Sequence, residues 1–111
     1  MNWITLNEIN QLQEIKEKSK VTPQVIFKHS TRCATSQMIK TRLERNDNPP
    51  GIDFYFLDLI NNRNVSNEVA ETFHVHHESP QILLIKNGEC VYDESHLGIS
   101  LDEVVEQNSM N

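Results

Sequence analysis

The sequence predicts an α/β domain built on a mixed β-sheet with helices on both of its faces. Short apolar runs alternate along most of the chain with segments whose apolar residues have helical spacing, a pattern typical of a largely parallel sheet. Near the carboxyl terminus, two consecutive apolar strands flank Asn87-Gly88, a dipeptide typical of tight hairpins. Part of the sheet is therefore expected to be antiparallel, and the expected element order is β-α-β-α-β-α-β-β-α.

Each expected strand is a short run rich in β-branched or aromatic residues and bounded by turn signals. In chain order these strands cover residues 3–6, 24–29, 52–59, 81–85 and 90–93. Right-handed crossovers place the strand at 24–29 beside the strand at 52–59 in parallel. The last two strands form the hairpin, because the turn at residues 86–89 has the signature of type I′.

The first two expected helices follow the first two strands. One opens at Asn7, carries Ile9 on its inner face and is broken before Pro23. The next starts at Cys33 and runs to about residue 45, where a loop rich in Asn, Asp, Pro and Gly ends it.

The last two expected helices are recognised by their caps. Ser66 or Asn67 is expected to cap the third helix, which continues to about Phe73. Ser100 is expected to cap the fourth, residues 101–106, through a capping box with Glu103.

Length, charge and cysteine content restrict the class of protein. The 111 residues suit a single domain over residues 1–111, with a polar and frayed tail from about residue 108. A net charge of −6 argues against nucleic acid and against an anionic membrane surface as partners. No signal peptide and no apolar run of roughly 20 residues is visible. Two unlike cysteines form no secreted disulfide framework, so we expect a cytoplasmic protein with reduced thiols.

Cys33 stands where a buried strand passes into the N-terminus of a helix. The unpaired N–H groups and the positive end of the helix dipole favour an anion there, so thiolate is favoured over thiol. The charge of Arg32 acts in the same direction. Ligands bind at the carboxyl ends of parallel strands, so Cys33 is the candidate nucleophile. The alternative for Cys33 is an inert, buried thiol.

Four segments, taken in order, resemble one family. They are FKHSTRC at 27–33, HESPQ at 77–81, KNG at 86–88 and SH at 95–96. Together they resemble the monothiol bacilliredoxins of the bacillithiol system, which have a thioredoxin-like fold. The resemblance covers nearly the whole chain, and Cys90 is its one departure. It implies a thiol–disulfide oxidoreductase that removes bacillithiol, the co-substrate thiol, from S-bacillithiolated cytosolic proteins.

The resemblance and the chemistry of thiol exchange assign catalytic roles. Cys33 is the nucleophile and Arg32 favours its thiolate. Ser36 replaces the second cysteine of a dithiol motif and could donate a hydrogen bond to the sulfur of Cys33. Because a serine cannot resolve a mixed disulfide, an outside low-molecular-weight thiol must release the intermediate. The plainer readings are a solvated surface charge for Arg32 and an ordinary first-turn residue for Ser36.

The expected substrate-binding residues come from three segments. Pro80 is predicted to follow a cis peptide bond, which leaves the backbone of Ser79 free to bind an extended substrate as a short added strand. Ser95 and His96 are candidates for binding the polar parts of the small thiol. Thr31, in the segment that carries the resemblance, completes the set. The plainer readings are a trans turn proline and an ordinary loop.

The role of Cys90 stays open, as does a short-range influence of His29 on Cys33, but Cys90 is not expected to bond to Cys33 and the histidines at 74–77 are not expected to bind a metal. Five residues of strand place the hairpin turn about 16 Å from Pro80. Cys90 begins the return strand there, so a Cys33–Cys90 bond is not expected. His74, His76 and His77 lack the spacing and the number of ligands of a zinc site, and no metal is expected.

Other functions stay open at this point. One is a general monothiol reductase that uses another thiol. Another is a non-enzymatic redox sensor or adaptor, modified at Cys33, which differs from an enzyme in lacking turnover. Iron–sulfur carriage usually goes with a Cys-Gly-Phe-Ser motif, whereas this chain has Cys-Ala-Thr-Ser at 33–36.

Overall fold

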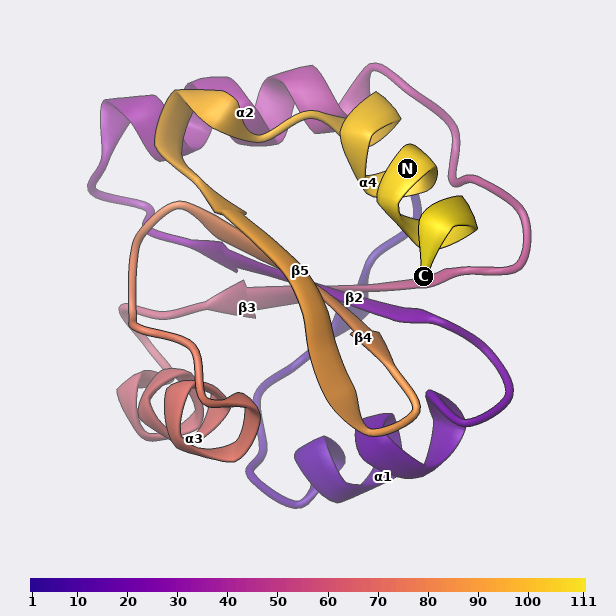
Figure 1. Cartoon of the computed structure of the whole chain (residues 1–111). Coiled ribbons are helices and arrows are strands. Elements are labelled where there is room, and N and C mark those ends of the chain that lie inside the picture. Colours follow the sequence, from indigo (N-terminus) through magenta and orange to yellow (C-terminus); the bar gives the residue numbers. More distant parts are fainter.

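The computed structural model describes the whole chain, residues 1–111, around one five-stranded sheet (Figure 1). The strands are β1 (Ile4–Thr5), β2 (Gln24–His29), β3 (Asp53–Asp58), β4 (Gln81–Lys86) and β5 (Glu89–Ser95). They follow the order β1-β3-β2-β4-β5 across the sheet. β1, β3 and β2 are parallel, whereas β4 runs antiparallel to β2 and pairs with β5 as a hairpin. The expected mixed sheet is confirmed.

Four α-helices cover the two faces of the sheet. They are α1 (Gln11–Lys18), α2 (Ala34–Glu44), α3 (Arg63–Phe73) and α4 (Leu101–Met110), and a short 3-10 helix, η1 (His96–Gly98), follows β5. α2 and α4 lie on one face, and α1 and α3 lie on the other (Figure 1). None of these helices is long and apolar enough to cross a membrane.

The central strand β2 sends alternate side chains into two cores. Ile26 packs in one cluster with Val69 of α3, whereas Phe27 packs in the other with Ile39 of α2. All six residues of β2 are buried. A central strand covered on both faces has no exposed side, which explains why the run is apolar except at its ends.

The first helix begins at Gln11, so the expected start at Asn7 is wrong. The Gln11 side chain accepts hydrogen bonds from the N–H groups of Asn7 and Glu8, both at 2.9 Å. It also donates to the Thr5 carbonyl at 2.9 Å. This side chain therefore holds residues 7–10 as a turn, and Ile9 is 46% exposed instead of facing the core.

The third helix begins at Arg63, so the expected cap at Ser66 or Asn67 is wrong. Ser66 is buried inside the helix, and its N–H donates to the Asn62 carbonyl at 3.0 Å. The additional first turn buries Val65 in line with two later apolar residues of the same helix. Burial of this stripe outweighs the local capping preference of the serine.

The last helix continues past the expected end at Glu106, so residues 108–110 belong to α4 and are not a frayed tail. Lys86 Nζ donates to the Asn108 carbonyl at 2.9 Å, which places a cation beside the free carbonyls of the last turn. Ser100 caps the helix as expected, accepting from the Glu103 N–H at 3.4 Å. The Glu103 carboxylate does not complete the capping box but accepts from a side chain one turn later.

One edge of the sheet gathers four strand ends. The Leu59 N–H donates to the His29 carbonyl at 3.0 Å, which joins the ends of β3 and β2. Gln81 at the start of β4 is opposite Lys28 of β2 on one side and Ser95 of β5 on the other. In Figure 1 the arrowheads of β2 and β5 and the start of β4 lie at this edge, and α2 follows directly from β2.

Candidate active site

Cys33 occupies the position immediately before the first turn of α2, with an extended backbone (φ −112°, ψ 119°). Its N–H donates to the Ser30 carbonyl at 3.2 Å, and its own carbonyl accepts from the Gln37 N–H at 3.1 Å. These two bonds turn the chain from β2 into the helix. The thiol is free and partly exposed at the N-terminus of α2, which is the positive end of the helix dipole.

Thr31 and Arg32 form the exposed turn that leads to Cys33. The Arg32 N–H donates to the Ser30 hydroxyl at 3.3 Å, which fixes the backbone of the turn. Ser30 itself is buried. Both Thr31 and Arg32 are therefore accessible to a molecule that approaches the Cys33 thiol.

Ser36 is completely buried in the first turn of α2. Its hydroxyl accepts from the Ser30 N–H at 3.0 Å and lies 2.8 Å from His29 Nδ1. No hydrogen bond joins Ser36 to Cys33 in this structure. The sequence predicts that the Ser36 hydroxyl can donate to the Cys33 sulfur. In the structure the partners of this hydroxyl are the Ser30 N–H and His29 Nδ1.

His29 is completely buried at the end of β2. Its ring packs against Phe27 and Phe56, with ring centroids 5.9 Å and 5.3 Å away. Burial and, to a lesser degree, the Lys40 charge lower the pKa of His29, although Asp58 acts in the opposite direction. The imidazole is therefore neutral at pH 7, and its Nε2 atom is buried with no hydrogen-bond partner.

Lys28 is a buried lysine next to the site that sequence reasoning leaves unassigned. The side chain has no exposed surface, and Nζ donates to the Ser66 carbonyl of α3 at 3.2 Å. Nζ also lies 3.2 Å from His77 Nδ1, in the segment that leads to Pro80. Burial lowers the pKa of Lys28 to about 8. The signal in the sequence is a lysine that directly follows the apolar residues of the central strand.

Pro80 stands at the start of β4, opposite the end of β2. The Ser79–Pro80 peptide bond is cis, and Pro80 is buried. The Pro80 carbonyl accepts from the His96 N–H at 3.0 Å, so His96 and its neighbour Ser95 lie beside the proline. The Ser79 hydroxyl is buried without a partner.

A second link joins the segment before Pro80 to η1. Glu78 Oε1 lies 3.0 Å from His96 Nε2, and Glu78 Oε2 lies 3.7 Å from His76 Nε2. η1 also packs against α2. The structure therefore brings the three sequence segments that carry the expected site residues, around Cys33, Pro80 and His96, to one edge of the sheet.

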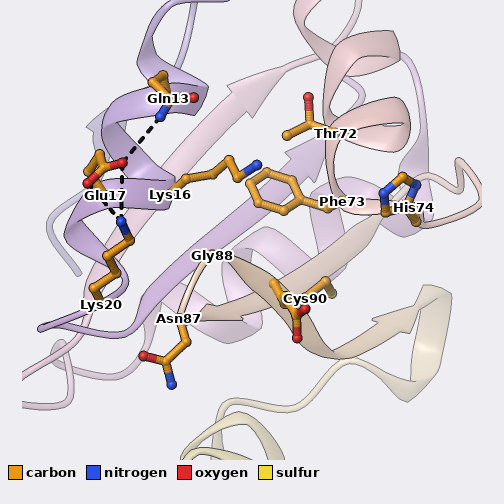
Figure 2. A pocket seen from close by; sticks show the side chains of 11 residues that line it. Gln13, Lys16, Glu17, Lys20, Thr72, Phe73, His74, Asn87, Gly88 and Cys90 are labelled. Carbon is orange, nitrogen blue, oxygen red and sulfur yellow. Dashed lines mark hydrogen bonds and ion pairs between the residues drawn. The ribbon is translucent and has the colours of Figure 1, made fainter.

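The largest hollow of the protein, about 690 Å³, does not have Cys33 among its lining residues. Figure 2 shows this hollow from close by. It is lined by residues of α1, the end of α3 and the β4–β5 hairpin, including Lys16, Phe73, His74 and Cys90. Burial raises the pKa of Cys90 to about 11, and its Sγ donates to the Tyr92 carbonyl at 3.3 Å. Cys33 lines none of the five hollows, and its thiol is partly exposed.

The histidines of residues 74–77 do not gather around a common point. His77 lies against Lys28, whereas His76 and His96 flank Glu78. No group of three or more His, Cys, Asp or Glu side chains is arranged to hold a metal ion.

Comparisons with known proteins agree with this arrangement. A protein-family model described as "Monothiol bacilliredoxin BrxC" matches residues 4–104. A solved structure described as a candidate oxidoreductase with a thioredoxin fold is 28% identical, with a TM-score of 0.78, over 95% of this chain and 92% of that chain. Thioredoxin from Malassezia sympodialis is 16% identical (TM-score 0.75; 98% and 90% covered), and thioredoxin from Fasciola hepatica is 19% identical (TM-score 0.71; 96% of each). The expected thioredoxin-like fold is confirmed.

Proposed function

This chain belongs to the monothiol bacilliredoxin family BrxC, and on this premise we propose that it removes bacillithiol from S-bacillithiolated proteins in the cytoplasm. Family and fold make it a redox protein. The observation that supports the finer proposal most strongly is the partly exposed thiol of Cys33 at the N-terminus of α2. A thiol on open surface suits a substrate disulfide that is carried by another protein.

The proposed reaction is two successive thiol–disulfide exchanges. The Cys33 thiolate attacks the bacillithiol sulfur of the protein mixed disulfide, the old S–S bond breaks, and the client cysteine leaves as a thiolate. Bacillithiol is then attached to Cys33. A second low-molecular-weight thiolate attacks that bacillithiol sulfur, which releases the Cys33 thiolate and a small disulfide. Electrons balance, because each step forms one S–S bond and breaks one.

An outside thiol is needed because neither Ser36 nor Cys90 can resolve the mixed disulfide on Cys33. Ser36 has no sulfur. Cys90 is opposite Ile85 in the hairpin, whereas the active-site end of the same two strands is at the pair of Gln81 and Ser95. Cys90 therefore lies several residues of strand away from that end. Its high pKa also keeps its thiol protonated near neutral pH.

Substrate binding is proposed at the edge formed by Thr31, Ser79, Pro80, Ser95 and His96. Because the Ser79–Pro80 backbone comes immediately before β4, whose first residue is opposite Lys28 of β2, an extended client segment could add to it as a short strand. His96, more than half exposed and held by the Pro80 carbonyl, is placed to meet the polar parts of bacillithiol. Arg32 would favour the thiolate of Cys33 and the approach of anionic groups.

The test is transfer of bacillithiol from a bacillithiolated client protein, followed by intact-protein mass spectrometry. We expect one bacillithiol on the wild type and on Cys90→Ser, and none on Cys33→Ser. Added bacillithiol should then return Cys33 to the free thiol. Two outcomes would contradict the proposal: equal loss of transfer in Cys33→Ser and Cys90→Ser, or no transfer to the wild type.

The alternative is a non-enzymatic redox sensor or adaptor modified at Cys33. The same exposed thiol would serve it, but the modified protein would persist in the presence of excess thiol. Repeated turnover with a client in large excess therefore separates the two functions: an enzyme deprotects many clients per molecule, whereas a sensor deprotects at most one.

A further inference from the structure

Lys28 is a buried cation without a counter-ion. Its side chain has no exposed surface, and no carboxylate forms an ion pair with it. The ammonium donates to the Ser66 carbonyl at 3.2 Å and lies 3.2 Å from His77 Nδ1. Burying an ammonium costs free energy that neutral partners offset only in part. A methionine would fill a similar volume without this cost, so packing alone does not account for a lysine at this position.

Lys28 contacts both ends of the segment that contains Ser79. Its backbone is opposite Gln81, the first residue of β4, and its ammonium lies against the side chain of His77 at the other end of the segment. In Figure 1 the connection from α3 to β4 passes the carboxyl end of β2. Residues 77–81 therefore form a loop that one residue of the central strand holds at both ends.

Two further contacts hold the same segment. Gln81 Nε2 donates to the His76 carbonyl at 3.0 Å, and Glu78 Oε1 lies 3.0 Å from His96 Nε2. The Glu78 side chain is 40% exposed, so solvent weakens its attraction for a histidine. Lys28 is thus the charged partner that reaches this segment from inside the protein.

We propose that Lys28 is a positioning residue, whose bond to His77 holds the backbone of Ser79 in place for an extended client segment. The inference rests on the proposed function, because it assumes that a client adds to this backbone as a short strand. Lys28 is buried and does not touch the client; it acts through the side chain of His77. A backbone that is held in place before binding loses less conformational entropy when the client binds.

Protonation of His77 would break this bond. At pH 7 the Lys28 ammonium donates and a neutral His77 accepts at Nδ1, whereas a protonated His77 would be a second cation beside the first. Burial and, after it, the Lys28 charge lower the pKa of His77 from its ordinary value of 6.5. The other charged groups that act on His77 are Glu78, which raises its pKa, and Arg63 and His76, which lower it.

The test compares two disulfide probes in a Cys90→Ser background, which has a single thiol. Each probe is a cysteine in disulfide linkage to thionitrobenzoate. In one probe the cysteine is part of a short extended peptide, and in the other it is N-acetylcysteine amide. The Cys33 thiolate attacks the cysteine sulfur, one S–S bond forms, one breaks, and the coloured thionitrobenzoate leaves as a thiolate. The ratio of the two rates measures the gain from the peptide backbone, because the reactivity of Cys33 cancels.

We expect the peptide to react faster than N-acetylcysteine amide with the Cys90→Ser protein. Lys28→Met should lower the ratio by up to roughly tenfold, the equivalent of one hydrogen bond to a charged group. Its effect on the rate with N-acetylcysteine amide should be far smaller. His77→Leu should lower the ratio likewise, and His77→Asn, whose side-chain oxygen can accept from the ammonium, should restore most of it. The matched control is Lys20→Met, which removes a 60% exposed lysine and should keep the ratio.

The pH profile separates this role from a general loosening of the fold. NMR titration of the imidazole gives the pKa of His77, which Lys28→Met should raise. The rate ratio should fall as the pH drops through that pKa and should stay constant in His77→Asn. Protonation of His76 and His96 would strengthen their contacts with Glu78 and would therefore act in the opposite direction.

An unchanged rate ratio in Lys28→Met, or an unchanged pKa of His77 in that variant, would overturn the inference alone. A ratio of one in the Cys90→Ser protein would overturn it together with strand addition at Ser79. Failure of bacillithiol transfer would leave these ratios as they are, so the two proposals fail separately. His77 is exposed, so its variants decide the question if Lys28→Met does not fold.

Discussion

Cys33 and Cys90 carry the same thiol in opposite surroundings. Cys33 is partly exposed before the first turn of α2, at the positive end of the helix dipole. Cys90 is packed against the core between α1 and α3, and its surroundings stabilise the neutral thiol. Residue type alone therefore does not decide reactivity; the neighbouring backbone dipoles and the burial do.

This contrast predicts selective alkylation. With a pKa of about 11, Cys90 is a thiolate in only about one molecule in a thousand at pH 8. Brief treatment with iodoacetamide at pH 8 should label Cys33 and leave Cys90 unlabelled, as read by peptide mass spectrometry. Cys33→Ser should then take up almost no label. Equal labelling of both cysteines in the folded wild type would contradict the assignment.

At the scale of elements, Lys28 connects three parts of the fold. Its ammonium reaches from β2 to the Ser66 carbonyl of α3 and to His77, close before the Ser79–Pro80 bond. Ser66 lies in the first half of α3 and is buried. The contacts of the Lys28 ammonium thus depend on the position of α3 as well as on the lysine itself.

The burial of the Lys28 ammonium predicts that the stability of the folded protein depends on pH. The pKa of Lys28 falls from 10.5 to about 8 on folding, so between these values the unfolded chain binds the extra proton. The contribution of Lys28 to the free energy of unfolding must therefore rise with pH across that window. Below about pH 8 the lysine is charged in both states, and the full free-energy cost of burying the cation, about 3 kcal/mol, is present. Urea unfolding at pH 7 and pH 10 should show the wild type gaining stability relative to Lys28→Met.

The matched control for this prediction is Lys20→Met, which removes a lysine whose side chain is 60% exposed. The difference between wild type and Lys20→Met should stay nearly constant between pH 7 and pH 10. A Lys28→Met difference that is equally constant would show that Lys28 titrates alike in the folded and unfolded chains.

At the scale of the whole molecule, the two cores share one sheet. The radius of gyration is 12.5 Å, close to the roughly 13 Å expected for a compact chain of this length. Trp3, the single tryptophan, stacks on Phe27 at 5.6 Å and donates to Glu44 Oε2 at 2.7 Å, on the side of α2. α1 and α3 pack on the opposite face.

We propose that residues 1–111 unfold as a single cooperative domain. Trp3 fluorescence reports the face covered by α2, and far-ultraviolet circular dichroism reports all helices, including those on the other face. The two signals should follow one denaturation curve with the same midpoint. Separate midpoints would show that the two faces unfold independently.

Local patterns in the sequence were sufficient to predict the sheet and the position of Cys33 before a helix. The run at 24–29, the hairpin at Asn87-Gly88 and the strand–helix junction at Cys33 each depend on neighbouring residues, and the structure has all three. Asn87 (φ 53°) and Gly88 (φ 80°) both have the positive φ of a type I′ turn, which the dipeptide favours.

Tertiary structure decided the helix starts and the polar partners. Gln11 displaced the start of α1, and burial of Val65 extended α3, because distant packing outweighs local capping preference. The His29–Ser36 contact joins a strand to a helix, and the Lys28–His77 contact joins residues 49 positions apart. The sequence by itself determined that Cys33 stands between a buried strand and the start of a helix. Only the folded chain decided which buried side chains lie nearby, since hydrogen bonds between elements depend on their final separation and burial.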